Sequence, residues 1–152
     1  MRKIFSITLI LSVALFVLFA CEEEGGNETK ISTSLSDDSH NAGQNCMKCH
    51  KSGGEGEGWF QAAGTVYHSN GSTTNSNAVV KLYTEPNGGG ELVATIEVDK
   101  KGNFYTTEDI DFSSGLYPQL EGINETKYMT VPTITGACNS CHGVTEAKLT
   151  IE

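Results

Sequence analysis

Residues 91–104 read ELVATIEVDKKGNF, and this stretch indicates the fold class. From Leu92 to Val98 apolar side chains partly alternate with others, which is the pattern of a half-buried β-strand. The Lys-Lys-Gly-Asn sequence at 100–103 is a strong turn signal, and residues that favour strands resume at Phe104. The stretch therefore predicts two short strands joined by a tight turn.

Similar segments recur along the second half of the chain. They are rich in Val, Ile, Thr, Tyr and Phe and are separated by Gly, Asn, Ser or Pro turns. Apart from the N-terminal apolar run, no stretch of helical period exceeds about a dozen residues. Seven such strands over about 90 residues predict an all-β domain, a small antiparallel β-sandwich. The predicted strands are residues 61–67, 78–84, 91–99, 103–107, 115–121, 127–131 and 147–152.

Residues 1–20 are predicted to be a signal peptide. Arg2 and Lys3 form a positive start, and an apolar run with only three hydroxyl residues follows. Residues 18–21, LFAC, resemble the lipobox of bacterial lipoproteins, with Phe19 at a usually small position. The resemblance implies lipidation of Cys21 and an exported protein that is lipid-anchored in the bacterial cell envelope. An uncleaved transmembrane anchor is the alternative, and it also places the domain outside the cytoplasm.

The remaining chain divides into a tether and one domain. Residues 21–39 begin with Cys21 and hold few large apolar side chains, which predicts a flexible tether before a domain at 40–152. The net charge is −9, and it becomes −11 when Arg2 and Lys3 leave with the signal. Such an acidic surface disfavours nucleic acid and anionic lipid heads as partners. Its plainest role is to keep the protein soluble.

Four of the five cysteines lie in two C-x-x-C-H motifs. Residues 46–50 read CMKCH and residues 138–142 read CNSCH, and this pattern is the attachment signature of c-type haem. Two thiols on one tight turn can each bond one vinyl group of the same porphyrin, while the following His becomes the proximal iron ligand. The sequence thus predicts two c-type haems. Their residues are Cys46, Cys49 and His50 for the first, and Cys138, Cys141 and His142 for the second.

Three other interpretations of the cysteine pairs compete with haem attachment. Two disulfides are compatible with an oxidising compartment. A redox site of thioredoxin type would lie near a βαβ pattern, which this chain lacks. The halves of a four-cysteine zinc site usually lie about 15–20 residues apart, whereas 88 residues separate Cys49 from Cys138. None of the three requires a His directly after each pair.

Each haem iron has a second axial position, which His or Met usually fills in electron-transfer haems. The chain has four His, so His40 and His68 match the two open positions in number. His40 lies ten residues before His50, in a Gly-containing loop long enough to cross a haem edge. His68 precedes a Ser-Asn-Gly turn, so it could be a turn residue instead of an iron ligand. Met129 alternates like a strand residue, which favours packing in the core over ligation.

Strand order suggests where His68 lies. If successive strands reverse direction, the two motifs lie at one end of the sandwich and His68 at the other, a strand length of about 23 Å away. His68 would then bind a haem of a neighbouring chain in a head-to-tail homo-oligomer, a ring or a filament. Ligation within the chain, or by Met129, is the alternative. The inference fails if any connection crosses over.

Two family resemblances add to these inferences. The segments 64–67, 78–82, 95–99 and 101–104 together resemble the carboxypeptidase regulatory-like, or transthyretin-like, sandwich over about residues 64–107. His40 and Gly43 before the first motif, followed by Gly64-Thr65-Val66-Tyr67, are similar to small exported multihaem cytochromes. The resemblance implies a haem module built around a β-sandwich in place of an all-helical cytochrome.

Electron transfer between redox partner proteins at the cell envelope or surface is the predicted function, and we do not expect an enzyme. A dihaem peroxidase is the main alternative, but such enzymes are far larger and carry one haem per domain. A haem-free sandwich that binds carbohydrate or protein is the third interpretation. An open, five-coordinate iron would favour the enzyme, whereas two six-coordinate irons would favour the relay.

Overall fold

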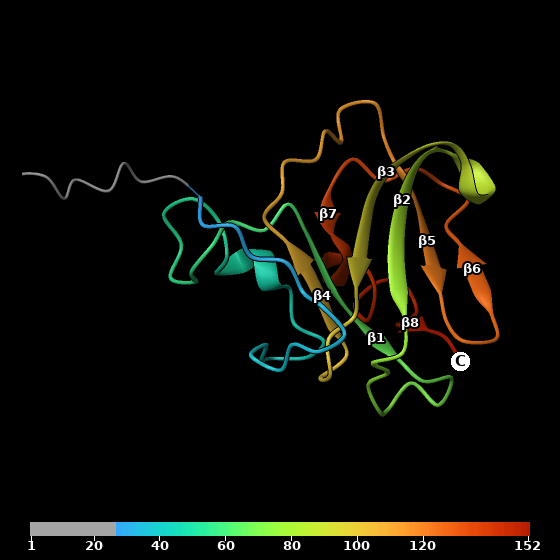
Figure 1. Ribbon diagram of the computed structural model, residues 1–152, viewed down its shortest axis with the longest axis horizontal. Helices are drawn as coiled ribbons and strands as arrows, with labels where there is room; N and C mark the ends of the chain where they lie inside the picture. The colour runs from blue at the N-terminus through green and yellow to red at the C-terminus, as the bar shows by residue number, and fades with distance from the viewer. Residues whose placement is uncertain (1–26) are drawn as a thin grey trace, which may run out of the picture.

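The computed structural model describes residues 27–152, which form an all-β fold of two sheets with three short 3-10 turns (Figure 1). In one sheet, β1 (Ala62–Tyr67) pairs with β4 (Asn103–Thr106), β7 (Gly136–Ala137) and β8 (Leu149–Thr150). The other sheet has the order β3 (Gly89–Glu97), β2 (Val79–Glu85), β5 (Tyr117–Glu121) and β6 (Thr126–Tyr128). The turns are η1 (Cys46–Lys48), η2 (Pro86–Gly88) and η3 (Cys138–Ser140).

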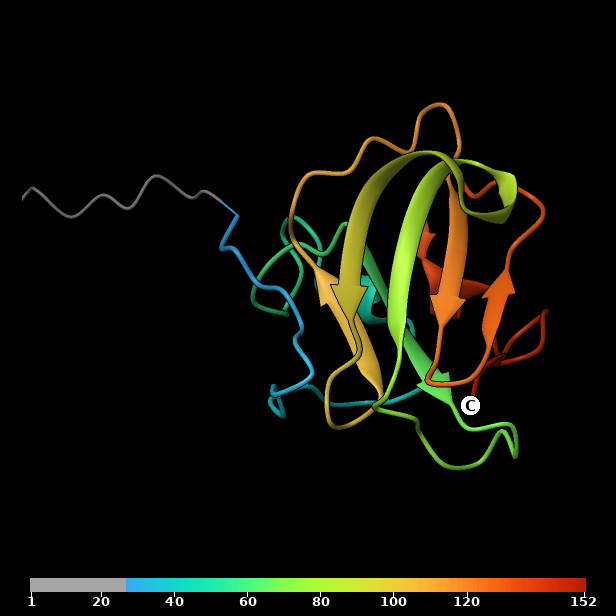
Figure 2. The same cartoon turned by 45° about the vertical axis from the view of Figure 1, so that its right-hand side comes forward.

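The two sheets form two layers around one apolar core (Figure 2). Val66 and Phe104 come from the β1 sheet, and Val80, Leu82 and Ile96 come from the β3-β2-β5-β6 sheet. All five side chains are almost fully buried. The prediction of an all-β domain is confirmed, and each of the seven predicted strands overlaps an observed one.

The tight turn predicted after residue 99 carries the chain from one layer to the other. Asp99 is fully buried, and its Oδ1 accepts hydrogen bonds from the backbone N–H groups of Lys101 and Asn103, both at 2.9 Å. Gly102 has a φ of +83°, which favours glycine. The two strands that flank this turn, β3 and β4, therefore lie in different sheets.

The predicted antiparallel arrangement is only partly correct. The β3-β2-β5-β6 sheet and the β1–β4 pair are antiparallel, but β7 and β8 both run parallel to β1. After β6 the chain crosses to the other sheet, forms the two-residue β7, passes through η3 and returns as β8 in the same direction. Strand patterns in a sequence indicate where strands are, whereas such crossovers depend on tertiary packing.

Segment 27–39, where composition predicts a flexible tether, makes hydrogen bonds to β4, to Thr107 after it and to the end of β3. Ile31 forms an antiparallel bridge with Thr106, and the N–H of Ser32 donates to the Tyr105 carbonyl at 2.9 Å. The Ser32 side chain is 1% exposed; its Oγ donates to the Glu97 carbonyl at 2.6 Å and accepts from the Tyr105 N–H at 3.0 Å. Backbone pairing covers an edge strand without apolar side chains, which explains why composition misses it.

We expect Ser32→Ala to lower the free energy of unfolding by about 1–3 kcal/mol, because it removes two hydrogen bonds and takes the side-chain acceptor away from the partly buried Tyr105 N–H. Thr29→Ala, at an exposed position of the same segment, is the matched control and should change little. Chemical denaturation of both variants measures the difference. Equal midpoints would show that the segment contributes nothing to the fold.

Candidate haem sites

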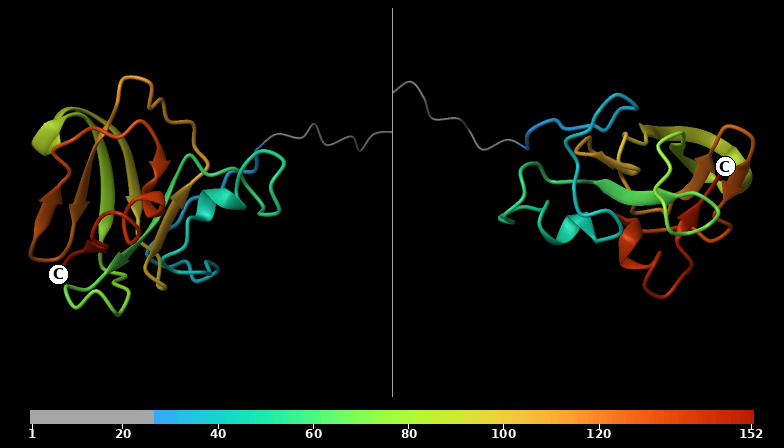
Figure 3. Two further views of the ribbon diagram at one scale, coloured as in Figure 1. Left: turned by 180° about the vertical axis from the view of Figure 1, so that it is seen from behind. Right: turned by 90° about the horizontal axis from the view of Figure 1, so that it is seen from below.

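The two C-x-x-C-H motifs lie side by side against β1, far apart as they are in sequence. Figure 3 shows η1 (teal) and η3 (orange-red) next to each other in views from behind and from below. Both turns contact β1. The side-chain amide of Asn139, within the second motif, donates to the carbonyl of Gln44, just before the first, at 3.0 Å. The predicted closeness of the two motifs therefore holds, although the strand-reversal reason for it does not.

The two motifs share the same pair of backbone hydrogen bonds. In the first, the Cys46 carbonyl accepts from the N–H groups of Cys49 at 3.2 Å and His50 at 3.0 Å. In the second, the Cys138 carbonyl accepts from Cys141 at 3.3 Å and His142 at 3.0 Å. No disulfide joins the four motif cysteines. Each turn therefore presents two thiols and an imidazole from five consecutive residues.

Both motif histidines have their Nδ1 atoms held by a backbone carbonyl. His50 Nδ1 lies 2.8 Å from the Glu57 carbonyl oxygen, and His142 Nδ1 lies 2.8 Å from that of Ala147. A carbonyl oxygen only accepts, so Nδ1 must carry the proton and donate. Nε2 is then the free ring nitrogen. This is the arrangement that proteins use to orient a metal-binding His.

A cavity of about 480 Å³ lies at the first motif, within the size range of small-molecule and cofactor sites. Cys46, Cys49 and His50 line it together with His40. The aromatic ring of Phe60 also lines it and stacks on the His50 ring at a centroid distance of 4.2 Å. Thiols, imidazoles and an aromatic wall are the groups that a covalently bound porphyrin requires. The residues present therefore fit a c-type haem.

His40, predicted as a distal ligand, lines the same cavity as His50. The two ring centroids lie 5.8 Å apart with an interplanar angle of 36°. Two imidazoles on opposite sides of one metal, each bonded at about 2 Å, have centroids roughly 6 Å apart. The loop that carries His40 makes a tight turn, in which Asn41 and Gly43 have φ of 54° and 85°. The separation suits two axial ligands of one iron.

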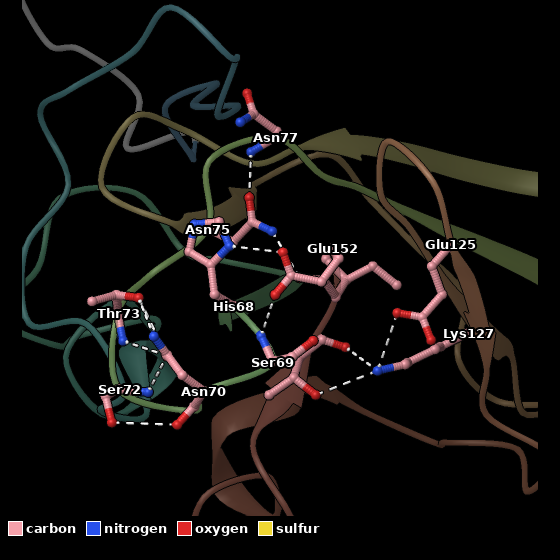
Figure 4. A network of polar contacts seen from close by, with 12 residues as sticks. His68, Ser69, Asn70, Ser72, Thr73, Asn75, Asn77, Glu125, Lys127 and Glu152 are labelled. Atoms are coloured by element: carbon pink, nitrogen blue, oxygen red, sulfur yellow. Dashed lines mark hydrogen bonds and ion pairs between the residues drawn. The ribbon is translucent and has the colours of Figure 1, made fainter.

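His68 follows β1 and belongs to a polar network at the end of that strand (Figure 4). Its Nδ1 lies 3.4 Å from the Glu152 carboxylate, which also accepts from the Ser69 N–H at 2.8 Å. These hydrogen bonds lower the pKa of Glu152, and the bond from the Ser69 N–H has the largest effect. Since β8 runs parallel to β1, the chain after the second motif returns to the end of β1 that carries His68. There Lys148 Nζ donates to the Gly71 carbonyl at 2.9 Å. The reason given for placing His68 far from both motifs, and hence for a head-to-tail oligomer, is therefore wrong.

The cysteine environments bear on the competing interpretations. Burial raises the pKa of the Cys46 thiol and raises that of Cys138 to about 12. Thioredoxin-type sites need the opposite shift, toward the thiolate. Within the described part of the chain, no three His, Cys, Asp or Glu side chains are grouped as a metal site.

Several residues of the site carry no signal in the sequence. Gly56 must remain small because a Cβ there would lie 2.7 Å from the His50 ring. Thr65 and Asn139 are buried polar residues that join the two motif loops. Their contacts span 74 residues of sequence, so only the tertiary structure reveals them.

No protein-family model, curated protein or solved structure matches the chain. The predicted signal peptide and Cys21 lie outside the described residues. Within residues 27–152, no helix has the length and apolar character that a membrane crossing requires.

Proposed function

We propose that this protein is an exported dihaem c-type cytochrome that transfers electrons at the cell envelope. The observation that carries the proposal is the repetition of one local geometry at two distant points of the chain. At each C-x-x-C-H motif a single Cys carbonyl closes the turn, and the His Nδ1 is held 2.8 Å from a backbone carbonyl. Two disulfides, or a zinc site with four cysteine ligands, would give no role to the His of either motif and so no reason for this repeated orientation of its ring.

The residues would divide the binding task as follows. Cys46 and Cys49 would form the thioethers to the first haem, and His50 and His40 would bind its iron from opposite sides. Cys138, Cys141 and His142 would do the same for the second haem, with His68 as the candidate for its distal position. When bound, each haem supplies reversible one-electron iron chemistry, and ligation by two His favours a lower potential than ligation by Met.

Electron relay is favoured over catalysis by the surroundings of the first motif. His40 and His50 both line the cavity with ring centroids 5.8 Å apart, and an iron bound by both would have no open position for a substrate. The contact between the two motif loops supports exchange of electrons between two closely spaced haems. The acidic surface would suit redox partner proteins and disfavours nucleic acid.

The protein would be held at the membrane through a lipid on Cys21. Only five residues lie between Cys21 and Asn27, so the span is at most about 22 Å. The Asn27 side chain pairs with the backbone of Trp59, donating to its carbonyl at 2.9 Å and accepting from its N–H at 2.6 Å. Trp59 follows the loop that holds His50, so the lipid would keep the first haem near the membrane surface.

The test of the proposed function is the haem content of protein produced in a host that matures c-type cytochromes. We expect the intact mass to exceed that of the processed polypeptide by two haems, with a low-spin cytochrome c absorption spectrum. The double change Cys46→Ala plus Cys49→Ala should remove one haem and leave the other. A haem-free protein with two disulfides would contradict the proposal.

His40→Ala should open the iron of the first haem, because no other imidazole lines that cavity opposite His50. We expect part of the absorption spectrum to become high-spin and about one more carbon monoxide to bind per chain than in the wild type. Asp38→Ala changes an exposed residue of the same cavity and is the control. If both irons of His40→Ala stay six-coordinate, another residue is the distal ligand.

Cys21→Ser should release the protein from membranes or block its processing, because a serine cannot be acylated through sulfur. Cell fractionation and the mass of the mature N-terminus measure this. Ser39→Ala, in the described segment that follows, provides a control that leaves the lipidation motif intact. Unchanged retention and processing of Cys21→Ser would indicate a transmembrane anchor.

A further inference from the structure

A buried polar network joins the second haem motif to the loop that carries His40. At its centre lies Thr65 on β1, which is 1% exposed. The Thr65 hydroxyl donates to Asn103 Oδ1 at 2.7 Å and accepts from Asn139 Nδ2 at 3.1 Å and from the Gly43 N–H at 2.8 Å. The donor and both lone pairs of the hydroxyl are therefore used.

Asn139 makes the connection between the motifs. It is 4% exposed, and its Oδ1 accepts from the Thr65 N–H at 3.1 Å. In the sheet, β7 ends at Ala137, so the Asn139 side chain continues the pairing with β1 beyond the end of the strand. Its Nδ2 donates both to Thr65 and to the Gln44 carbonyl at 3.0 Å. All its hydrogen-bonding groups point toward β1 and the His40 loop.

The network holds the His40 loop at both ends. Near its start, Asn103 Nδ2 donates to Ser39 Oγ at 2.9 Å and to the His40 carbonyl at 3.5 Å. Near its end, Gly43 and Gln44 are bound to Thr65 and Asn139 as described above. Between these points the loop turns tightly, with the Gln44 N–H donating to the Asn41 carbonyl at 3.0 Å. The position of the His40 ring depends on these attachments, because residues 39–45 contain no helix or strand.

We propose that Asn139, although it belongs to the second C-x-x-C-H motif, is a positioning residue for His40 at the first haem. The proposal rests on the proposed function, since it concerns a ligand of that haem. Loss of the Asn139 side chain would leave the Gln44 carbonyl and the Thr65 N–H, both bound by this side chain, unpaired. The His40 loop would then move away from His50. The identity of a residue in one motif would thereby control the coordination of the other haem.

The test uses the matured, haem-loaded protein. In Asn139→Ala we expect two haems per chain but about one more carbon monoxide bound than in the wild type, with a matching high-spin fraction. Ser140→Ala is the control within the same motif, since the exposed Ser140 Oγ contacts the Ala137 carbonyl and the neighbouring Cys141 Sγ but no residue of the His40 loop. It should leave the coordination of both irons unchanged.

Combining Asn139→Ala with His40→Ala identifies the affected iron. If Asn139 acts through His40, the double variant binds no more carbon monoxide than His40→Ala alone. If Asn139→Ala instead opens the second haem, the double variant binds about one carbon monoxide more than His40→Ala. That second result would overturn the proposal.

Thr65→Val keeps the test valid if Asn139→Ala impairs attachment of the second haem. Thr65 lies outside both motifs, and its change to Val removes the central hydroxyl, so it should open the first iron in the same way. Thr65→Ser keeps the hydroxyl and should leave that iron closed. If the wild type contains two low-spin haems and neither Asn139→Ala nor Thr65→Val opens one, this inference is wrong while the proposed function stands. A haem-free wild type would contradict the proposed function itself.

Discussion

Burial of strand β1 on both of its faces is the constraint on which the rest of the structure depends. All six residues from Ala62 to Tyr67 are buried. Ala62 and Val66 face the second sheet and belong to the apolar core. Thr65 faces the opposite way, toward the loops of the two motifs. The motif loops are therefore one of the two layers that cover this strand, and they complete the fold while they form the candidate haem sites.

The strands could be predicted well from sequence because their signals are local. Alternating apolar residues and Gly or Asn turns are sufficient to locate all seven predicted strands. What could not be predicted depends on partners far away in the chain. The two-residue β7 exists because Gly136 and Ala137 pair with Ala62 and Ala63, and no period can be read from two residues. Likewise, the pairing of residues 30–32 with β4 depends on an edge strand more than 70 residues away.

In the candidate sites too, some residues can be predicted from the neighbouring sequence, whereas others depend on contacts with distant parts of the chain. Thioether attachment and proximal ligation involve five consecutive residues, so the motif alone specifies them. His40 is within reach because its loop is short, and it was predicted from that spacing. The strand-reversal premise behind the inference about His68 is wrong, because β7 and β8 run parallel to β1, and ligation by His68 stays a prediction. Thr65 and Asn139 could not be identified in advance, since an ordinary strand Thr and a motif Asn acquire a role only where they meet.

The two walls of the first cavity are held by different parts of the molecule. The wall with His40 is attached to β1 and η3 through Thr65 and Asn139. The wall with His50 depends on the loop to Glu57, whose carboxylate is bound by Lys30 Nζ at 2.8 Å.

The hydrogen bond from Lys30 is the main cause of a lowered pKa at Glu57. The contribution of this pair is therefore present at neutral pH and is lost only as the pH falls below the ordinary range of a glutamate. Because the pair is exposed, it contributes little to the free energy of unfolding, and its main effect is on the position of the loop. Lys30 lies in the segment that follows the predicted lipid site. The distance between His40 and His50 thus depends both on the contact between the two motifs and on the segment that would lead to the membrane.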